Sequence, residues 1–67
     1  MLIKKSITIK KHRTSLSLEK EFWDALKIIS NKQKCSLETL ITKIDSNRQT
    51  SLASSIRVYL LKFYVKN

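Results

Sequence analysis

The spacing of hydrophobic residues changes near residue 19, and the change separates a predicted strand from a predicted helix. Over residues 13–18, R-T-S-L-S-L, polar and apolar residues alternate, and a period of two predicts a strand with one buried face. The face that we expect to be buried carries Thr14, Leu16 and Leu18. The opposite face, which we expect to be exposed, carries Arg13, Ser15 and Ser17.

Three helices are predicted after this strand, over residues 19–33, 37–46 and 52–65. In the first, apolar residues recur every three or four positions, and acids lie in the first turn, where the helix dipole favours negative charge. Ser36 is the expected N-cap of the second helix, and Thr50 or Ser51 that of the third. The third helix is apolar over more than half of its surface, which is typical of a helix that is buried on several sides.

Residues 1–11 are interpreted as a basic arm, and Ile3, Ile7 and Ile9 favour an extended conformation for part of it. The first 13 residues contain five Lys and Arg and no acid, and the whole chain has 14 Lys and Arg against five Asp and Glu. A formal net charge of +9 with this uneven distribution indicates a polyanionic partner. Nucleic acid is the leading candidate, and an anionic membrane surface is the weaker alternative.

A chain of 67 residues can bury only a small core, and such domains usually need a disulfide, a metal or a partner chain. Cys35 is the only cysteine and His12 the only histidine, so we expect neither an internal disulfide nor a four-ligand zinc site. A single strand also leaves its backbone groups unpaired. We therefore expect a second copy of the chain to supply the pairing strand across a two-fold axis.

The sequence also indicates in which compartment the protein lies and whether it is an enzyme. No apolar run approaches the roughly 20 residues of a membrane span, and no signal peptide is recognised, so we expect a cytoplasmic protein without membrane contact. The five acids are scattered and none is paired with His12. We therefore expect no enzymatic activity and no cofactor.

The order of arm, strand and helices resembles the ribbon-helix-helix family of bacterial DNA-binding proteins. The resemblance lies in H-R-T-S-L-S-L-E-K-E-F-W-D-A-L, then in S-L-E-T-L-I and S-L-A-S-S-I-R-V-Y-L-L. It extends to a subgroup of small alphaproteobacterial members that begin with a segment like K-K-S-I-T-I. It implies a mostly α-helical ribbon-helix-helix fold, in which strands from two subunits form an antiparallel ribbon that enters the major groove.

The resemblance also implies which residues contact DNA. Base contacts are expected from the outward strand residues Arg13, Ser15 and Ser17. A phosphate is expected at the N-terminus of the second helix, where free N–H groups also attract anions on physical grounds. With the basic residues around the strand, the expected phosphate-contacting set is Lys4, Lys5, Lys10, Lys11, His12, Lys34, Ser36 and Leu37.

The dimer interface is expected to combine the inward strand residues with the apolar faces of the first two helices. Its members are Thr14, Leu16, Leu18, Phe22, Trp23, Leu26, Leu40, Ile41 and Ile44. Trp23 is also a candidate stacking platform for single-stranded nucleic acid, but its position on a helix beside Phe22 favours the core or the interface.

These observations predict a homodimeric, sequence-specific protein that binds double-stranded DNA, acts as a transcriptional repressor and can assemble further on DNA. The alternative is a protein-interaction module, an antitoxin-like protein or an adaptor, that contacts a protein partner through the apolar third helix.

Overall fold

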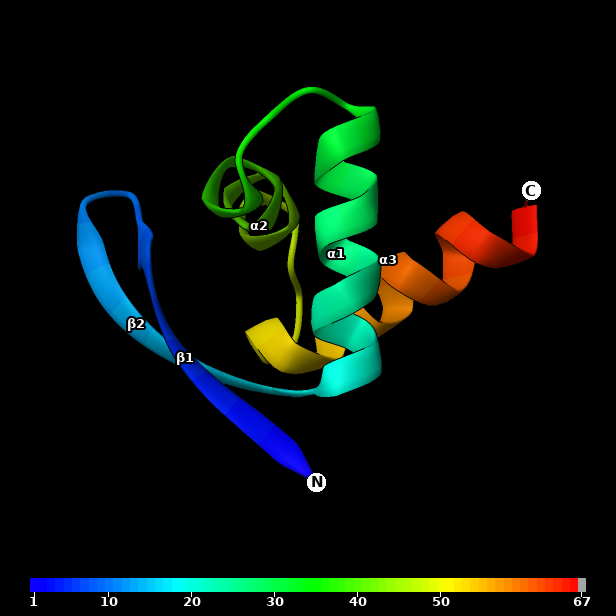
Figure 1. Cartoon of the computed structure of the whole chain (residues 1–67). Coiled ribbons are helices and arrows are strands. Elements are labelled where there is room, and N and C mark those ends of the chain that lie inside the picture. The colour runs from blue at the N-terminus through cyan, green and yellow to red at the C-terminus, as the bar shows by residue number, and fades with distance from the viewer. Residues whose placement is uncertain (67) are drawn as a thin grey trace.

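The chain folds into an N-terminal β-hairpin followed by three helices (Figure 1). The structure is a computed structural model and describes residues 1–66. Its elements are β1 (Leu2–Ile9), β2 (His12–Glu19), α1 (Lys20–Lys32), α2 (Leu37–Ser46) and α3 (Leu52–Lys66). This confirms the prediction of a mostly helical fold with an N-terminal ribbon and three helices.

The ribbon is formed within one chain. β1 pairs antiparallel with β2, and the register runs from Leu2 opposite Glu19 to Ile9 opposite His12. Two predictions are therefore wrong: residues 2–9 are a strand and not an arm, and the partner strand of the ribbon comes from the same chain and not from a second copy. The physical reason is that β1 pairs with the backbone groups along one edge of β2 without any second molecule.

The turn that joins the strands explains why the hairpin was missed. Lys10 and Lys11 are its two central residues, with φ values of 51° and 70°. Two-residue loops with positive φ at both positions are the common hairpin turns, and they usually contain Asn and Gly. This chain has no glycine at all, so the usual sequence signal of a hairpin is absent.

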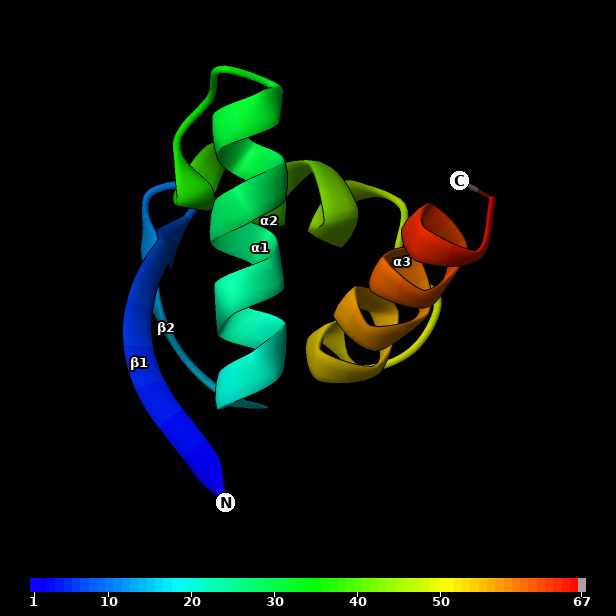
Figure 2. The same ribbon diagram turned by 45° about the vertical axis from the view of Figure 1, so that its right-hand side comes forward.

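The helices cover one face of the hairpin, and the core lies between them (Figure 2). The predicted alternation in β2 is confirmed, because Leu16 and Leu18 are buried and Thr14 is half-buried. On β1, Ile7 and Ile9 join the same buried face. The helical part of the core consists of Trp23, Leu26, Ile29, Leu40, Ile41, Ile44, Ile56 and Leu60.

This core corrects the predicted dimer interface. Two of the nine predicted members, Thr14 and Phe22, are half-buried. The other members are buried inside one chain: Leu16, Leu18, Trp23, Leu26, Leu40, Ile41 and Ile44. A side chain that is already covered by its own chain offers no surface to a second copy, so these residues are core residues of the single chain.

Local hydrogen bonds determine where the helices begin and end. The Ser36 side chain accepts a hydrogen bond from the backbone N–H of Thr39 and caps α2 as predicted, and Ser51 accepts one from Ser54 at the start of α3. After α1, the backbone N–H of Cys35 donates to the carbonyl of Ser30 over 3.0 Å, and Lys34 adopts a φ of 55°. This is a Schellman motif, in which glycine usually occupies the position of Lys34.

Candidate nucleic-acid interface

The face of the hairpin that points away from the helices is polar and basic. The register places Lys4 opposite Ser17, Ser6 opposite Ser15 and Thr8 opposite Arg13. Directly opposed residues share one face of an antiparallel pair. We call these six residues the outer ribbon face: Lys4, Ser6, Thr8, Arg13, Ser15 and Ser17.

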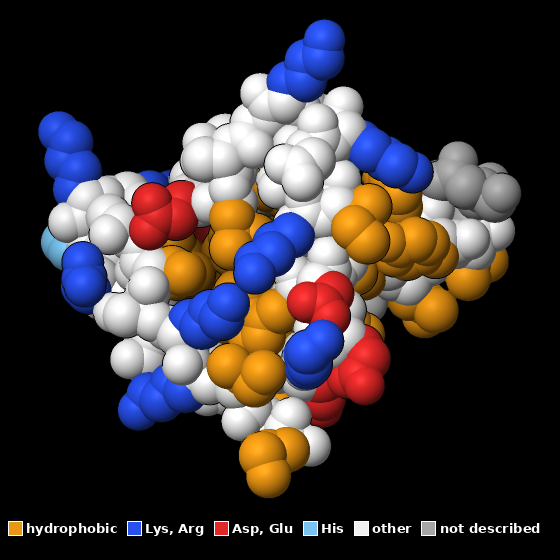
Figure 3. Space-filling model, viewed as in Figure 1, with side chains coloured by type: hydrophobic (Ala, Val, Ile, Leu, Met, Phe, Trp, Pro, Cys, Tyr) orange, Lys and Arg blue, Asp and Glu red, His pale blue; other side chains and the backbone are white. Residues whose placement is uncertain are grey.

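The outer ribbon face is open to solvent, and none of its six residues is acidic; the next register pair on the same side, Leu2 opposite Glu19, places an acid at its base. Lys4, Ser6, Arg13 and Ser15 are exposed, and Thr8 and Ser17 are half-buried. Four of the six side chains carry hydroxyl groups, which can both donate and accept hydrogen bonds. Figure 3 shows Lys and Arg side chains around the hairpin, on the left of the molecule. The face can therefore approach a polyanion and form directional hydrogen bonds with it.

Ser6 and Thr8 are not among the site residues predicted from the sequence, because residues 1–11 are interpreted there as an arm. A signal was present: the apolar residues Ile3, Ile7 and Ile9 occupy odd positions and leave Ser6 and Thr8 on the other face. Lys5 obscured this alternation, since it also occupies an odd, inward position.

Lys5 is not on the outer ribbon face. Its Nζ lies 5.1 Å from the centre of the Trp23 ring, and its side chain is half-buried. A Lys ammonium over an indole ring is held by a cation–π interaction. The prediction that Lys5 contacts DNA phosphate is therefore not supported by its position. Trp23 itself is 1% exposed and cannot stack on a base, so the core interpretation of this residue is the correct one.

The other predicted phosphate-contacting residues of the hairpin lie at its tip. Lys10, Lys11 and His12 are exposed there. His12 is opposite Ile9 and so shares the inward face, at the point where the hairpin extends beyond its covered part. Three cationic or titratable side chains at one end of a ribbon provide a position for backbone phosphates on either side of a groove.

The N-terminus of α2 lies beside the edge of β1. The backbone N–H of Thr8 donates to Oε2 of Glu38 over 2.8 Å, and Glu38 lies in the first turn of α2. Lys34 and Ser36 are exposed next to this turn, and Leu37 is half-buried. The structure therefore brings the predicted anion-binding helix end to the hairpin, but it also brings a carboxylate that sequence analysis did not include.

The family comparison agrees with this arrangement. The family model of the ribbon-helix-helix domain matches residues 2–64. The chain belongs to the ribbon-helix-helix family. No curated protein and no solved structure matches it. The family is a DNA-binding, transcription-regulator type of fold, it is not an enzymatic one, and its members generally bind DNA as dimers. The finer likeness to an alphaproteobacterial subgroup stays a prediction.

In this ribbon-helix-helix protein, the only acid of the hairpin is at its base. Glu19 Oε1 accepts a hydrogen bond from Nη2 of Arg57 on α3 over 3.1 Å. The pKa of the Glu19 carboxyl is lowered, first by a hydrogen bond from its own backbone N–H and then by that from Arg57. The negative charge of Glu19 is thus paired with the helical layer, at the end of the hairpin away from the Lys10–Lys11 turn.

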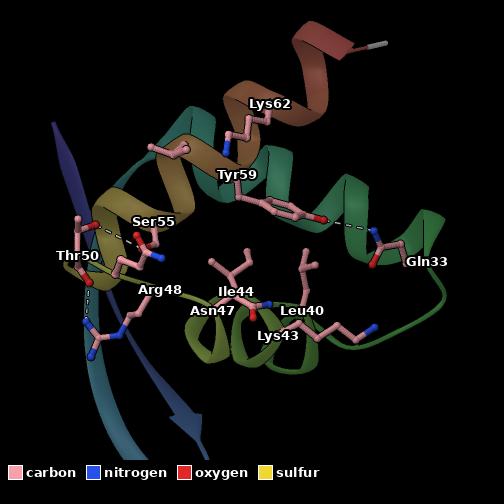
Figure 4. A pocket seen from close by; sticks show the side chains of 12 residues that line it. Gln33, Leu40, Lys43, Ile44, Asn47, Arg48, Thr50, Ser55, Tyr59 and Lys62 are labelled. Atoms are coloured by element: carbon pink, nitrogen blue, oxygen red, sulfur yellow. Dashed lines mark hydrogen bonds between the residues drawn. The ribbon is translucent and has the colours of Figure 1, made fainter.

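A pocket of about 660 Å³ opens between α2 and α3 of the ribbon-helix-helix fold (Figure 4). Leu40 and Ile44 from α2 face Tyr59 from α3, and Gln33 Nε2 donates to the Tyr59 hydroxyl over 3.4 Å. Lys43, Arg48 and Lys62 line it as well, and the lining contains no Asp, Glu, His or Cys. It therefore offers no carboxylate, imidazole or thiol for acid–base or nucleophilic catalysis.

Among residues 1–66, no group of three His, Cys, Asp or Glu side chains is close enough to hold a metal ion. No helix in the same range is both long enough and apolar enough to cross a membrane.

Proposed function

We propose that this protein is a homodimeric, sequence-specific DNA-binding regulator that inserts its hairpin into the major groove. The observation that carries the proposal is the outer ribbon face: two cations and four hydroxyl groups on one exposed surface, with no acid among residues 1–18. We also propose that the protein is cytoplasmic and that it represses transcription. A protein bound to its operator excludes other proteins from that DNA.

The dimensions of the ribbon fit this mode of binding. Two strands lie about 4.8 Å apart, and the major groove is about 12 Å wide and admits a two-stranded ribbon. The ribbon of one chain is therefore sufficient, and it does not need a strand from a second copy.

The roles of individual residues follow from their side chains. Arg13 is proposed to contact a guanine through two hydrogen bonds, and Ser15 and Ser17 to contact base edges less selectively. Ser6 and Thr8 join them from β1. The proposed phosphate contacts come from Lys4, Lys10, Lys11, His12 and Lys34, which determine affinity more than sequence preference.

The test is a titration of the protein into duplex DNA that carries a preferred sequence selected from a random pool. Arg13→Ala is expected to lower the affinity for that sequence by about 1–3 kcal/mol and to relax preference at one position. The matched control is Lys62→Ala, which removes one cation from α3 and is expected to act weakly and equally on all sequences.

Two results would contradict the proposal. One is an Arg13→Ala variant with the affinity and the sequence preference of the unchanged protein. The other is binding of the unchanged protein, near physiological salt, that is no tighter than the non-specific range of about 10⁻⁴ to 10⁻⁶ M.

A further inference from the structure

The pocket between α2 and α3 is built from one face of each helix (Figure 4). Residues three or four positions apart share a helix face, and the two helices contribute matching sets of two apolar or aromatic side chains and one lysine. These are Leu40, Ile44 and Lys43 from α2, and Val58, Tyr59 and Lys62 from α3. We call this space the α2–α3 pocket. Its volume of about 660 Å³ lies in the range of about 300–1,000 Å³ that is usual for small-molecule sites.

The inner wall of the α2–α3 pocket is apolar. Leu40 and Ile44 are buried and form its floor, and Figure 4 shows both side chains pointing from α2 toward α3. The Tyr59 ring lies across from them, and its hydroxyl is held by the Gln33 side chain. Val58 remains 48% exposed on the α3 wall. The pocket therefore leaves apolar surface in contact with water, and a ligand with an apolar body would be stabilised by covering it.

The charged side chains that line the α2–α3 pocket are all positive: Lys43, Arg48 and Lys62. Arg48 is already paired, since its Nε donates to Oδ1 of Asp45 over 2.6 Å. Lys43 and Lys62 are exposed, and neither forms an ion pair among residues 1–66. Two cations without a counter-charge, next to an apolar wall, favour a ligand that carries a negative charge.

We infer that the α2–α3 pocket binds a small organic anion in which an apolar body is joined to a carboxylate or phosphate group. The apolar body packs on Leu40, Ile44 and Tyr59, and Lys43 and Lys62 hold the anionic group at the rim. Small-molecule sites commonly have this division, with a mostly apolar lining and a few polar groups that orient the ligand. The inference goes beyond the proposed function and does not rest on it.

DNA is the competing anion for Lys43 and Lys62. None of the residues that line the α2–α3 pocket belongs to the hairpin, so the pocket is not part of the outer ribbon face. A phosphate backbone is bound through its charge, and it carries no apolar body that would cover Val58 and the Tyr59 ring. The apolar wall therefore favours a small amphipathic anion over DNA.

The test is a titration of isotope-labelled protein with 2-naphthoate, followed by the backbone amide resonances. This probe joins an apolar double ring to one carboxylate. Saturable shift changes are expected at Lys43, Val58 and Tyr59, with a dissociation constant of about 1 mM or lower. 2-Naphthamide has the same shape without the charge and is expected to bind at least about threefold more weakly. Acetate has the charge without the rings and is expected to cause no saturable change at these residues.

Val58→Glu places a negative charge on the wall of the pocket. It is expected to weaken the binding of 2-naphthoate at least about tenfold, because like charges repel at close range. The matched control is Leu61→Glu, which changes the net charge equally. Leu61 is 63% exposed on the same helix but does not line the α2–α3 pocket, and this variant is expected to keep the affinity of the unchanged protein to within about twofold.

Lys43→Met keeps the apolar stem and removes the cation, and is expected to weaken the binding about threefold or more. Its control is Lys27→Met, an equal loss of charge on the exposed side of α1, outside the pocket. Far-ultraviolet circular dichroism tests whether each variant is folded, which is expected because all four replaced side chains are exposed. If Val58→Glu does not fold, the comparison of Lys43→Met with Lys27→Met decides.

Several results would overturn the inference. One is the absence of binding, and another is a 2-naphthamide affinity equal to that of 2-naphthoate. Shift changes at the hairpin in place of Lys43, Val58 and Tyr59 would assign the anion to the outer ribbon face. Equal affinities of Val58→Glu and Leu61→Glu for 2-naphthoate would place the probe elsewhere. DNA binding is measured without the probe, so a failure of the DNA-binding proposal leaves these results unchanged.

Discussion

The indole Nε1 of Trp23 donates a hydrogen bond to the carbonyl oxygen of Ile3 over 2.9 Å. This bond connects α1 to the first strand across 20 residues of sequence. Trp23 is 1% exposed, and Lys5 from the same strand covers its ring. The pair holds β1 against the helices, so the core closes within a single chain.

Trp23→Phe is expected to lower the free energy of unfolding by about 1–3 kcal/mol, because it removes the hydrogen bond and leaves a small cavity. Urea unfolding followed by circular dichroism measures this, since the variant lacks the only tryptophan. Lys5→Met is the comparison: it keeps the apolar stem and removes the cation, and we expect a loss of about 1 kcal/mol or less. A Trp23→Phe protein as stable as the unchanged one would contradict the role of this bond.

Lys34→Gly is expected to stabilise the protein by about 1 kcal/mol, because Lys34 has a φ of 55° that glycine adopts without steric cost. The matched control is Lys32→Gly, which lies within the last turn of α1 and is expected to destabilise the protein by about 1 kcal/mol. Thermal unfolding of the two variants tests this. If Lys34→Gly and Lys32→Gly changed the stability by the same amount in the same direction, the turn between α1 and α2 would have another conformation.

Replacing Lys10–Lys11 with Asn-Gly is expected to separate stability from DNA binding. Both positions have positive φ, and Asn-Gly is the preferred pair in such hairpin turns, so the free energy of unfolding should rise by about 1 kcal/mol or more. The variant also loses two cations at the hairpin tip. Its DNA affinity should therefore depend less on salt, with a log–log slope that is smaller by about 2. A less stable variant would contradict the positive-φ conformation of the turn. An unchanged salt slope would contradict the proposed phosphate contacts of Lys10 and Lys11.

Glu19→Gln is expected to flatten the loss of stability in acid. The pKa of Glu19 is below its ordinary value of 4.5 in the folded protein, so its ionised form favours folding. That contribution is present above pH 4.5 and is lost as the pH falls through the lowered pKa of the folded state. Unfolding free energies measured over this range test the prediction. Glu21→Gln is the control, since Glu21 has no ion-pair partner among residues 1–66.

Much of the fold could be predicted because its signals are local. The alternation over residues 13–18 correctly separates the buried Leu16 and Leu18 from the exposed Arg13 and Ser15. Apolar spacing predicts three helices, and Ser36 signals the start of α2 by the hydrogen bond that its side chain forms. Each of these signals depends on neighbours within one or two turns of the chain.

The partner of β2 could not be predicted in this way. The turn at Lys10–Lys11 is a backbone conformation that two lysines adopt without the usual Asn or Gly. The inward position of Lys5 breaks the alternation of β1, and only the ring of Trp23 explains why a lysine is tolerated there. The contacts of Trp23 join residues about 20 positions apart, so no local pattern reveals them.

The sequence therefore specified the chemistry of the candidate site: the basic N-terminal segment, Arg13 and the serines of β2. Tertiary packing decided how that chemistry is arranged. It added Ser6 and Thr8 from β1, turned Lys5 inward and placed Glu38 beside Thr8. It also enclosed the expected interface residues in one core and left only the outward side chains of α3 exposed, because a hairpin formed within one chain completes the layer for which a second copy was expected.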